Sequence, residues 1–333
     1  TWTPILGTTT EGSCVDGTDA LGCNVYLKGL FVDADERVTF VDHGLVRFID
    51  GSGRVQAMVA RPLSTDDGLN ANSARIGGVR ALGRSDAGEV IFSDQDSVAI
   101  RSVADDGSGD VTALAGNGQE GTWNTTDPAV EQPVNFHLSG SYLDFFVVDP
   151  PTGDIFFNRS LLALHRLVRT TGLWTPLVYG STTPWYLPAA DGLPGSAVDY
   201  RATYSYVIGT NGTQVLVSKS EWLSPRRPFL KTYDMTTGAQ GHVVGVNDNT
   251  VGFPDDGPIN AACHAVGIYY GASWDGAGWL FADGRRIRRI DGASISTVAT
   301  QPESIAAFAR RPTTSADILY TCGRSSGSLF ELD

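Results

Sequence analysis

Three histidines in the chain could hold a catalytic zinc ion. His43 follows an apolar segment, whereas His137 and His264 each precede one. Three imidazoles with an open fourth position are a ligand set that makes zinc catalytic. However, their spacings are irregular, and the sequence reveals no carboxylate that would orient them. A hydrogen-bonding role beside a loop is the simpler interpretation, and His165 and His242, which lie within apolar segments, are interpreted as structural.

Aspartates recur in the polar loops, where calcium would need several oxygens converging on one point. They are Asp66, Asp67, Asp191, Asp255 and Asp256. No D-x-[DN]-x-[DN]-G loop is present. Such Asp side chains commonly accept bonds from backbone N–H groups of their own turns, and this is the interpretation adopted. We therefore predict no cofactor, with calcium or zinc as the alternative.

Other catalytic signatures are missing from the sequence. No G-x-S-x-G nucleophile elbow occurs. Gly116–Gly121 has the letters of a G-x-G-x-x-G motif, but it enters a polar loop and not a helix, so it is not a nucleotide site. The sequence therefore predicts that the protein is not an enzyme.

Large aromatic side chains and arginines gather in three loops. These residues are Trp123, Trp185, Tyr186, Trp222, Arg226 and Arg227. Aromatic rings bind the apolar faces of sugars, and together with arginine they anchor protein partners. Alternatively, the rings fold inward and form small cores beneath the loops. We predict that these six residues bind the ligand.

The cysteines suit disulfides better than a metal site, because no C-x-x-C or Cys/His spacing typical of zinc occurs. Cys14 and Cys23 flank a polar, glycine-containing loop and are predicted to pair. Cys263 and Cys322 could form a second bridge, or Cys322 could pair with the N-terminal region. The sequence leaves the connectivity of Cys263 and Cys322 open.

The composition excludes several classes of partner. With 24 basic and 37 acidic residues the net charge is −13, and no basic stripe offsets it, so nucleic-acid binding is not expected. No apolar run approaches the ~20 residues of a membrane helix. The even number of cysteines and the few lysines favour an extracellular location. The chain begins at Thr1 without Met, so we expect a processed piece of a longer protein.

A repeat of four strands must position these residues. Each unit has an apolar strand, a strand ending in a small or acidic residue, a third strand of polar alternation and a fourth strand after a glycine turn. The units cover residues 27–60, 77–118, 142–181, 204–247, 266–300 and 304–333. Radial repetition of this kind predicts an all-β, six-bladed β-propeller that forms a single domain over residues 1–333.

The sixth unit ends one strand short. Thr1–Gly7 has no sheet of its own, and its WTP matches the WTP of Leu173–Gly180, the fourth strand of unit three. We therefore predict that the N-terminal strand completes the last blade beside Leu329–Leu332, which leaves no open sheet edge. A two-sheet sandwich or an open solenoid would not explain the missing strand.

The segments between the units resemble those of NHL-repeat propellers. The resemblance is clearest in the segments AGNGQEG, FADGRRIRRID and FPDDGPINAA, which begin at Ala115, Phe281 and Phe253. Units three and four depart from it at Asn158 and Ser218, near the place where Asp usually closes the second strand. The resemblance implies a propeller like the modules of large bacterial adhesins. Six-bladed propellers also include lactonases and lyases with a metal on the central axis.

In such blades the fourth-to-first and second-to-third connections share one face, and here they are long. Function tends to lie on long loops carried by a rigid scaffold, so this long-loop face is predicted to bind, chiefly at blades three and four. We predict a non-enzymatic, extracellular recognition or adhesion module that binds a glycan or protein, within a larger and conceivably oligomeric bacterial surface or fibre protein. The alternative is a metal-dependent propeller hydrolase or lyase that uses His43, His137 and His264.

Overall fold

The structure of the chain is a computed structural model. It describes residues 2–7, 14–33, 35–59, 76, 78–116, 132–133, 146–158, 163–179, 204–220, 228–244, 256–258, 271–292, 294–311, 318–323 and 328–332. No described helix is long and apolar enough to cross a membrane. The one helix in these ranges is a short 3-10 turn, Ala20–Gly22.

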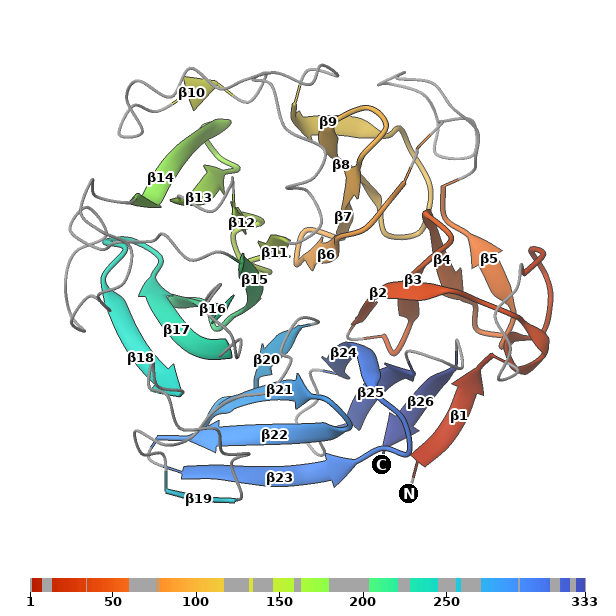
Figure 1. The fold of residues 1–333 in the computed structure, drawn as a ribbon. Helices are drawn as coiled ribbons and strands as arrows, with labels where there is room; N and C mark the ends of the chain where they lie inside the picture. Colours follow the sequence, from red (N-terminus) through yellow and green to blue (C-terminus); the bar gives the residue numbers. More distant parts are fainter. Residues whose placement is uncertain are drawn as a thin grey trace.

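Six antiparallel sheets radiate from a common centre, which confirms the predicted six-bladed β-propeller (Figure 1). The first three blades contain the following strands, given from the innermost to the outermost. Blade 1 has β2 (Leu27–Val32), β3 (Val38–Asp42), β4 (Leu45–Ile49) and β5 (Val55–Ala57). Blade 2 has β6 (Leu82–Ser85), β7 (Glu89–Asp94), β8 (Ala99–Ala104) and β9 (Thr112–Ala115). Blade 3 has β11 (Phe146–Val148), β12 (Ile155–Asn158), β13 (Ala163–Val168) and β14 (Leu173–Tyr179).

The other three blades repeat the same order. Blade 4 has β15 (Tyr204–Thr210), β16 (Gln214–Ser220), β17 (Pro228–Asp234) and β18 (Gln240–Val244). Blade 5 has β20 (Ala272–Trp274), β21 (Trp279–Asp283), β22 (Arg286–Asp291) and β23 (Ser294–Thr300). Blade 6 has β24 (Ile305–Arg311), β25 (Ile318–Gly323), β26 (Leu329–Leu332) and β1 (Trp2–Leu6).

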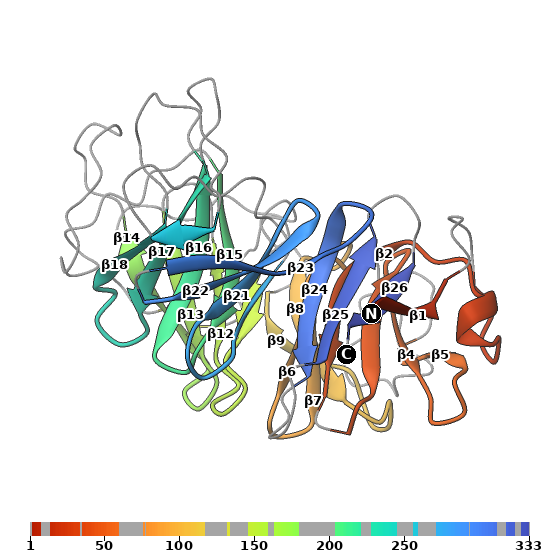
Figure 2. The same ribbon diagram turned by 90° about the horizontal axis from the view of Figure 1, so that it is seen from below.

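The N-terminal strand closes the ring, as predicted. β1 runs antiparallel to β26, with Trp2 opposite Leu332 and Leu6 opposite Leu329. The two strands lie side by side in both views, with the chain ends close together (Figures 1 and 2). Blade 6 therefore joins the two ends of the chain, and its β26 edge is paired instead of open.

The apolar core is divided among the contacts between blades. Ile91 of blade 2 packs in one cluster with Phe157 of blade 3, and Leu216 of blade 4 in another with Phe281 of blade 5. Second strands such as β3 and β21 are buried along their whole length. Because a blade covers each face of these strands, they are continuous apolar runs without the alternation of a half-exposed sheet.

Glycines on the innermost strands let neighbouring blades approach closely. A Cβ atom on Gly83 would overlap Cγ2 of Val148 and lie 3.0 Å from its Cβ. A Cβ atom on Gly209 would lie 2.7 Å from the carbonyl oxygen of Ala272. Close approach of two backbones requires glycine, so these positions set the spacing of the ring at its narrow centre.

Two of the segments predicted as loops between blades contain an additional short strand. β10 (Gln132–Pro133) pairs with the outermost strand of blade 3, and β19 (Gly257–Pro258) pairs with that of blade 5. In blade 1 the backbone of Gly17 and Thr18 bonds to Val55 in the same way, at 2.8 and 2.9 Å. Each of these segments covers the outer edge of the blade that it enters, which protects the edge from pairing with another chain.

Candidate functional site

The six innermost strands line a channel of about 470 Å³. They are β2, β6, β11, β15, β20 and β24, and they surround the centre of the ring (Figure 1). Ligand sites in proteins commonly occupy ~300–1,000 Å³, so the channel has room for a small ligand.

The charges along this channel reverse the balance of the whole chain. The charged residues of its described lining are Lys28, Arg80, Arg84, Arg310, Asp33 and Asp86. Basic residues thus outnumber acidic ones four to two. In the chain as a whole, 37 acidic residues outnumber 24 basic ones. The described lining of the channel is therefore more basic than the chain as a whole.

The charged residues divide between the two ends of the channel. Lys28 stands at the beginning of β2, and Asp33 directly follows its end. Arg80 precedes β6, whereas Arg84 lies near the end of that strand and Asp86 follows it. Innermost strands start at the long-loop face, so Lys28 and Arg80 share that end. Arg84, Asp33 and Asp86 lie at the end with the tight turns.

At the tight-turn end the arginines are used in contacts within the protein. Arg84 Nη2 lies 2.7 Å from Oδ2 of Asp105, and Arg37 Nη1 donates to the carbonyl oxygen of Asp105 at 2.7 Å. Arg310 Nη1 donates to the carbonyl oxygen of Trp274 at 3.1 Å. These bonds tie blade 1 to blade 2 and blade 6 to blade 5.

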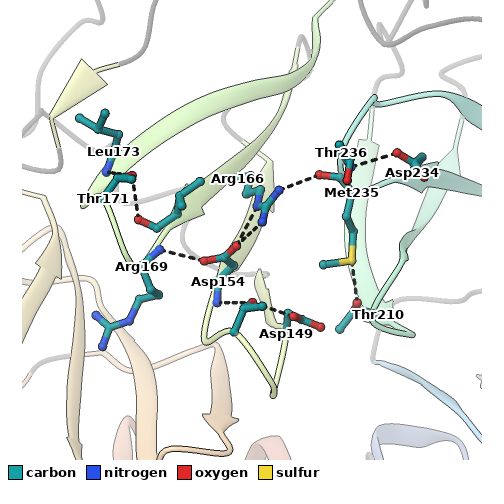
Figure 3. A network of polar contacts seen from close by, with 12 residues as sticks. Asp149, Asp154, Arg166, Arg169, Thr171, Leu173, Thr210, Asp234, Met235 and Thr236 are labelled. Carbon is teal, nitrogen blue, oxygen red and sulfur yellow. Dashed lines mark hydrogen bonds and ion pairs between the residues drawn. The ribbon is translucent and has the colours of Figure 1, made fainter.

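The tight turns of blade 3 extend this pattern (Figure 3). Arg166 Nε donates to Asp154 at 2.8 Å, and Arg166 Nη1 donates to the Met235 carbonyl of blade 4 at 3.0 Å. Arg169 Nη2 lies 2.9 Å from Glu89 of blade 2. Charge-assisted bonds of this kind are stronger than neutral ones. The face with the tight turns thus holds blades together through its arginines.

The long-loop end of the channel carries an exposed polar cluster. The ammonium of Lys28 lies 5.2 Å from the centroid of the Tyr26 ring, within cation–π range. The His43 ring lies 5.6 Å from the same centroid. Tyr26 is 37% exposed. A basic and an imidazole side chain therefore share one exposed aromatic ring.

The second-to-third connection of blade 1 is the two-residue turn His43–Gly44, which corrects the expectation that these connections are long. This turn brings blade 2 to the cluster. Gly44 adopts φ +81°, and a Cβ atom there would lie 3.3 Å from the Gly78 backbone. The Val79 N–H donates to the Gly44 carbonyl oxygen at 3.4 Å. This approach places Arg80 beside blade 1. We call the cluster at this end of the channel the channel mouth, which consists of Tyr26, Lys28, His43 and Arg80.

His43 has a carboxylate partner that sequence reasoning did not identify. Its Nδ1 lies 2.8 Å from Oδ1 of the buried Asp42, while the His43 side chain is 48% exposed. Asp42 also accepts the Tyr26 N–H at 2.8 Å and lies 3.6 Å from Nε of Arg47. His43 holds φ +48°, a conformation that is costly for a residue other than glycine.

Sequence reasoning also missed Tyr26, Lys28 and Arg80. Their only signal is position, because each lies within two residues of the start of an innermost strand. Polar residues are common at the starts of strands whether or not they bind a ligand. Only the ring places the starts of two innermost strands beside each other.

The other predicted site residues cannot be placed. The following lie outside the described residues: Trp123, Trp185, Tyr186, Trp222, Arg226, Arg227, His137, His264, Asp66, Asp67, Asp191 and Asp255. His165 lies in β13, fully buried, with its ring 5.7 Å from the Phe157 ring.

Asp256 bonds to other strands of its blade, and the predicted bonds within its own turn stay a prediction. It accepts the Thr297 hydroxyl at 2.8 Å and lies 3.3 Å from the guanidinium of the fully buried Arg288. The bond from the Thr297 N–H is the main cause that lowers the pKa of Asp256. Asp16 makes the equivalent contact to Arg47 of blade 1, at 3.4 Å. Among the described residues, no group of three or more His, Cys, Asp or Glu side chains is arranged to hold a metal ion.

Cys14 and Cys23 form the predicted disulfide, with Cα atoms 5.1 Å apart. This pairing excludes the alternative in which Cys322 pairs with one of them. Cys322 is fully buried in β25, and burial raises the pKa of its thiol. Cys263 lies outside the described residues, so its bridge to Cys322 stays a prediction.

Comparison with solved structures supports the fold. The chain is similar to an auxiliary nutrient binding protein from Bacteroides thetaiotaomicron, with a TM-score of 0.61 and 13% identity over 100% of this chain and 76% of that one. A second auxiliary nutrient binding protein, from Bacteroides ovatus, has a TM-score of 0.62 and 13% identity over 100% of this chain and 76% of that one. A gluconolactonase from Xanthomonas campestris has a TM-score of 0.55 and 11% identity over 99% of this chain and 88% of that one.

At such identities the likeness concerns the propeller fold alone. No protein-family model matches the chain, and no curated protein matches it either.

Proposed function

We propose that the chain is a single-domain, non-enzymatic recognition module that binds a glycan or protein ligand through the long-loop face of the propeller. One observation carries the proposal: the channel reaches that face at an exposed cluster of aromatic and basic side chains, the channel mouth. At the opposite end, the arginines are used between blades. Ligand sites combine apolar surface with a few polar groups, and the long-loop end has both.

The proposal extends to the six aromatic and arginine residues in the long loops. In it, Trp185 and Tyr186 of the loop that enters blade 4 stack on the ligand, beside Trp123 and Trp222. Arg226 and Arg227 would follow Trp222 as hydrogen-bond donors. Trp, Tyr and Arg dominate the energetics of many binding sites, which supports this choice.

Location and repeat type belong to the same proposal. The Cys14–Cys23 disulfide favours an extracellular module of a larger bacterial surface protein. NHL-type repeats are supported by a recurring ion pair between a third-strand Arg and the Asp that ends the second strand. The pairs are Arg47–Asp42, Arg101–Asp94 and Arg288–Asp283. Homologues in which the two residues of each pair vary independently would count against this repeat type.

A glycan array tests the ligand class. We expect the wild-type protein to bind a subset of glycans, and Trp185→Ala to lose that binding. Val298→Ala is the matched control, because Val298 is an exposed apolar residue on the outer strand β23. If Trp185→Ala binds as wild type does, the aromatic site is wrong. If the wild-type protein binds no glycan, the ligand is not a glycan, and a protein is the ligand class that the proposal retains.

A metal-dependent hydrolase or lyase is the second candidate, and the Asp42–His43 pair favours it. Metal-bound histidines usually donate their other ring N–H to a carboxylate, as His43 is placed to do. The gluconolactonase of similar fold supports the same candidate. Metal analysis of the purified protein separates the two functions. Stoichiometric zinc or calcium that is lost in His43→Ala, His137→Ala or His264→Ala would overturn the recognition proposal.

A further inference from the structure

We propose that the channel mouth binds the carboxylate of an acidic sugar. The inference rests on the proposed glycan recognition and names the class of glycan. Its starting point is the reversal of charge: among the described residues, four basic and two acidic ones line the channel of a chain whose net charge is −13. An anion that approaches this acidic protein meets an excess of basic over acidic side chains along the described lining, and a local excess of one sign of charge attracts ions of the other sign.

The two cations at the mouth are placed to meet the carboxylate. Lys28 and Arg80 are both exposed and line the same end of the channel, on adjacent blades. The Lys28 ammonium lies 5.2 Å from the centroid of the Tyr26 ring, which puts a cation and an aromatic ring side by side at the mouth. The two acidic lining residues, Asp33 and Asp86, stand at the other end. A carboxylate at the mouth therefore meets basic lining groups first.

Asp42, which contacts two residues of the mouth, is already engaged within the protein. Asp42 is 2% exposed and contacts His43 at 2.8 Å, the Tyr26 N–H at 2.8 Å and Arg47 at 3.6 Å. It therefore does not offer its charge to the channel. Asp96, on the turn after β7, is an exposed acidic residue at the same end. It is neither a lining residue of the channel nor a member of the mouth.

The rest of the mouth suits a sugar better than a simple anion. The His43 Nδ1 lies 2.8 Å from the Asp42 carboxylate, and the tautomer that donates from Nδ1 leaves Nε2 as an acceptor for a hydroxyl. The exposed Tyr26 ring provides the apolar surface on which the C–H face of a sugar packs. Cation, hydroxyl acceptor and aromatic surface together match the groups of a uronic acid residue.

Isothermal titration with two disaccharides tests the inference. The probes are α-1,4-linked digalacturonate and its neutral counterpart, α-1,4-linked digalactose. We expect the acidic sugar to bind at least tenfold more tightly, and Lys28→Gln to weaken it by about tenfold. Arg285→Gln is the matched control, because this substitution removes one positive charge, as Lys28→Gln does. Arg285 is exposed and does not line the channel. Its affinity should equal that of wild type.

The outcomes separate this inference from the proposed function. Equal affinity for both sugars, no binding of either sugar, or an unchanged affinity in Lys28→Gln and in Arg80→Gln would each overturn the acidic-sugar site. Binding of neutral glycans on the array would then still stand. Thermal unfolding of Lys28→Gln, Arg80→Gln and Arg285→Gln is the folding control. Midpoints equal to that of wild type mean that a change in affinity reports binding and not folding.

Discussion

Trp2 lies directly opposite Leu332, so the strands at the two ends of the chain are neighbours in one sheet. The indole Nε1 of Trp2 also donates to the Thr300 carbonyl oxygen of blade 5, at 3.0 Å. The N-terminal strand is thus bonded to the last strand of blade 6 and to the neighbouring blade. The ring is held shut by contacts that join residues about as distant in sequence as the chain allows.

The buried end of this strand should carry most of its contribution to stability. Leu6 is fully buried, in a cluster shared by blades 6 and 1. We expect Leu6→Ala to reduce the free energy of unfolding by about 2–5 kcal/mol, because it leaves a cavity at the closure. Thr3 is an exposed residue of the same strand, and Thr3→Ala should change the free energy of unfolding by less than about 0.5 kcal/mol. Equal effects in chemical denaturation would mean that β1 does not close the ring in solution.

The narrow centre of the ring should not tolerate a methyl group on Gly83. Because its Cβ atom would overlap Val148, we expect Gly83→Ala to cost about 1–3 kcal/mol of unfolding free energy. Gly51→Ala is the control, since a Cβ atom there meets nothing within 4 Å. Val148→Ala should relieve the overlap, so the double variant should lose less than the sum of the two single variants. If the losses of unfolding free energy in the two single variants simply add up in the double variant, the proposed overlap of Gly83→Ala with Val148 is wrong.

The buried ion pair of blade 5 should be costly to break from one side. Arg288 is fully buried and lies 3.4 Å from Asp283, which is itself 3% exposed. Arg288→Met leaves the buried Asp283 with Arg286, 2.9 Å away, as its remaining cationic partner, so we expect a loss of about 1–3 kcal/mol in chemical denaturation. The double variant Arg288→Met/Asp283→Leu replaces both charges by apolar groups and should be more stable than the single one. A double variant that is less stable than Arg288→Met would show that the pair is not coupled in this way.

The turn at Asp234 should contribute to acid sensitivity. Its carboxylate accepts the Thr237 N–H, the Thr237 hydroxyl and the Thr236 N–H, and the first of these bonds is the main cause that lowers the pKa of Asp234. A pKa below the unfolded value of about 3.9 means that this stabilisation is present above about pH 4 and is lost as pH falls through the folded pKa.

We therefore expect Asp234→Asn to lose less stability than wild type does when the pH is lowered from 4 to 2. Unfolding free energies measured by urea denaturation across that range check the difference. Thr237→Val, which removes the hydroxyl donor and keeps the N–H donor, should fall between the two. An Asp234→Asn variant with the acid dependence of wild type would contradict the assignment.

The closure could be predicted because it is a property of strand order. The sixth unit lacks a strand, and Thr1–Gly7 has the sequence of one, so only one pairing leaves no open edge. Asp256 could not be predicted in the same way. Its partners, Thr297 and Arg288, lie on other strands of its blade, and an Asp beside Gly has the same appearance in the sequence whether it caps its own turn or reaches across.

The sequence by itself determined the repeat, the number of blades, the strand that closes the ring and the Cys14–Cys23 pair. The strands of each repeat and the Cys14–Cys23 pair depend on local pattern, because alternation, turn residues and short loops act within a few residues of each other. The number of blades and the closing strand follow from the order of the repeats along the chain. Only the tertiary structure decided which charges meet. Lys28 and Arg80 belong to different repeats, and the ring alone places them at one end of a channel. The electrostatic potential at a site depends on which charges are close in space and not on which are close in sequence. A basic channel in an acidic protein therefore cannot be recognised from the composition.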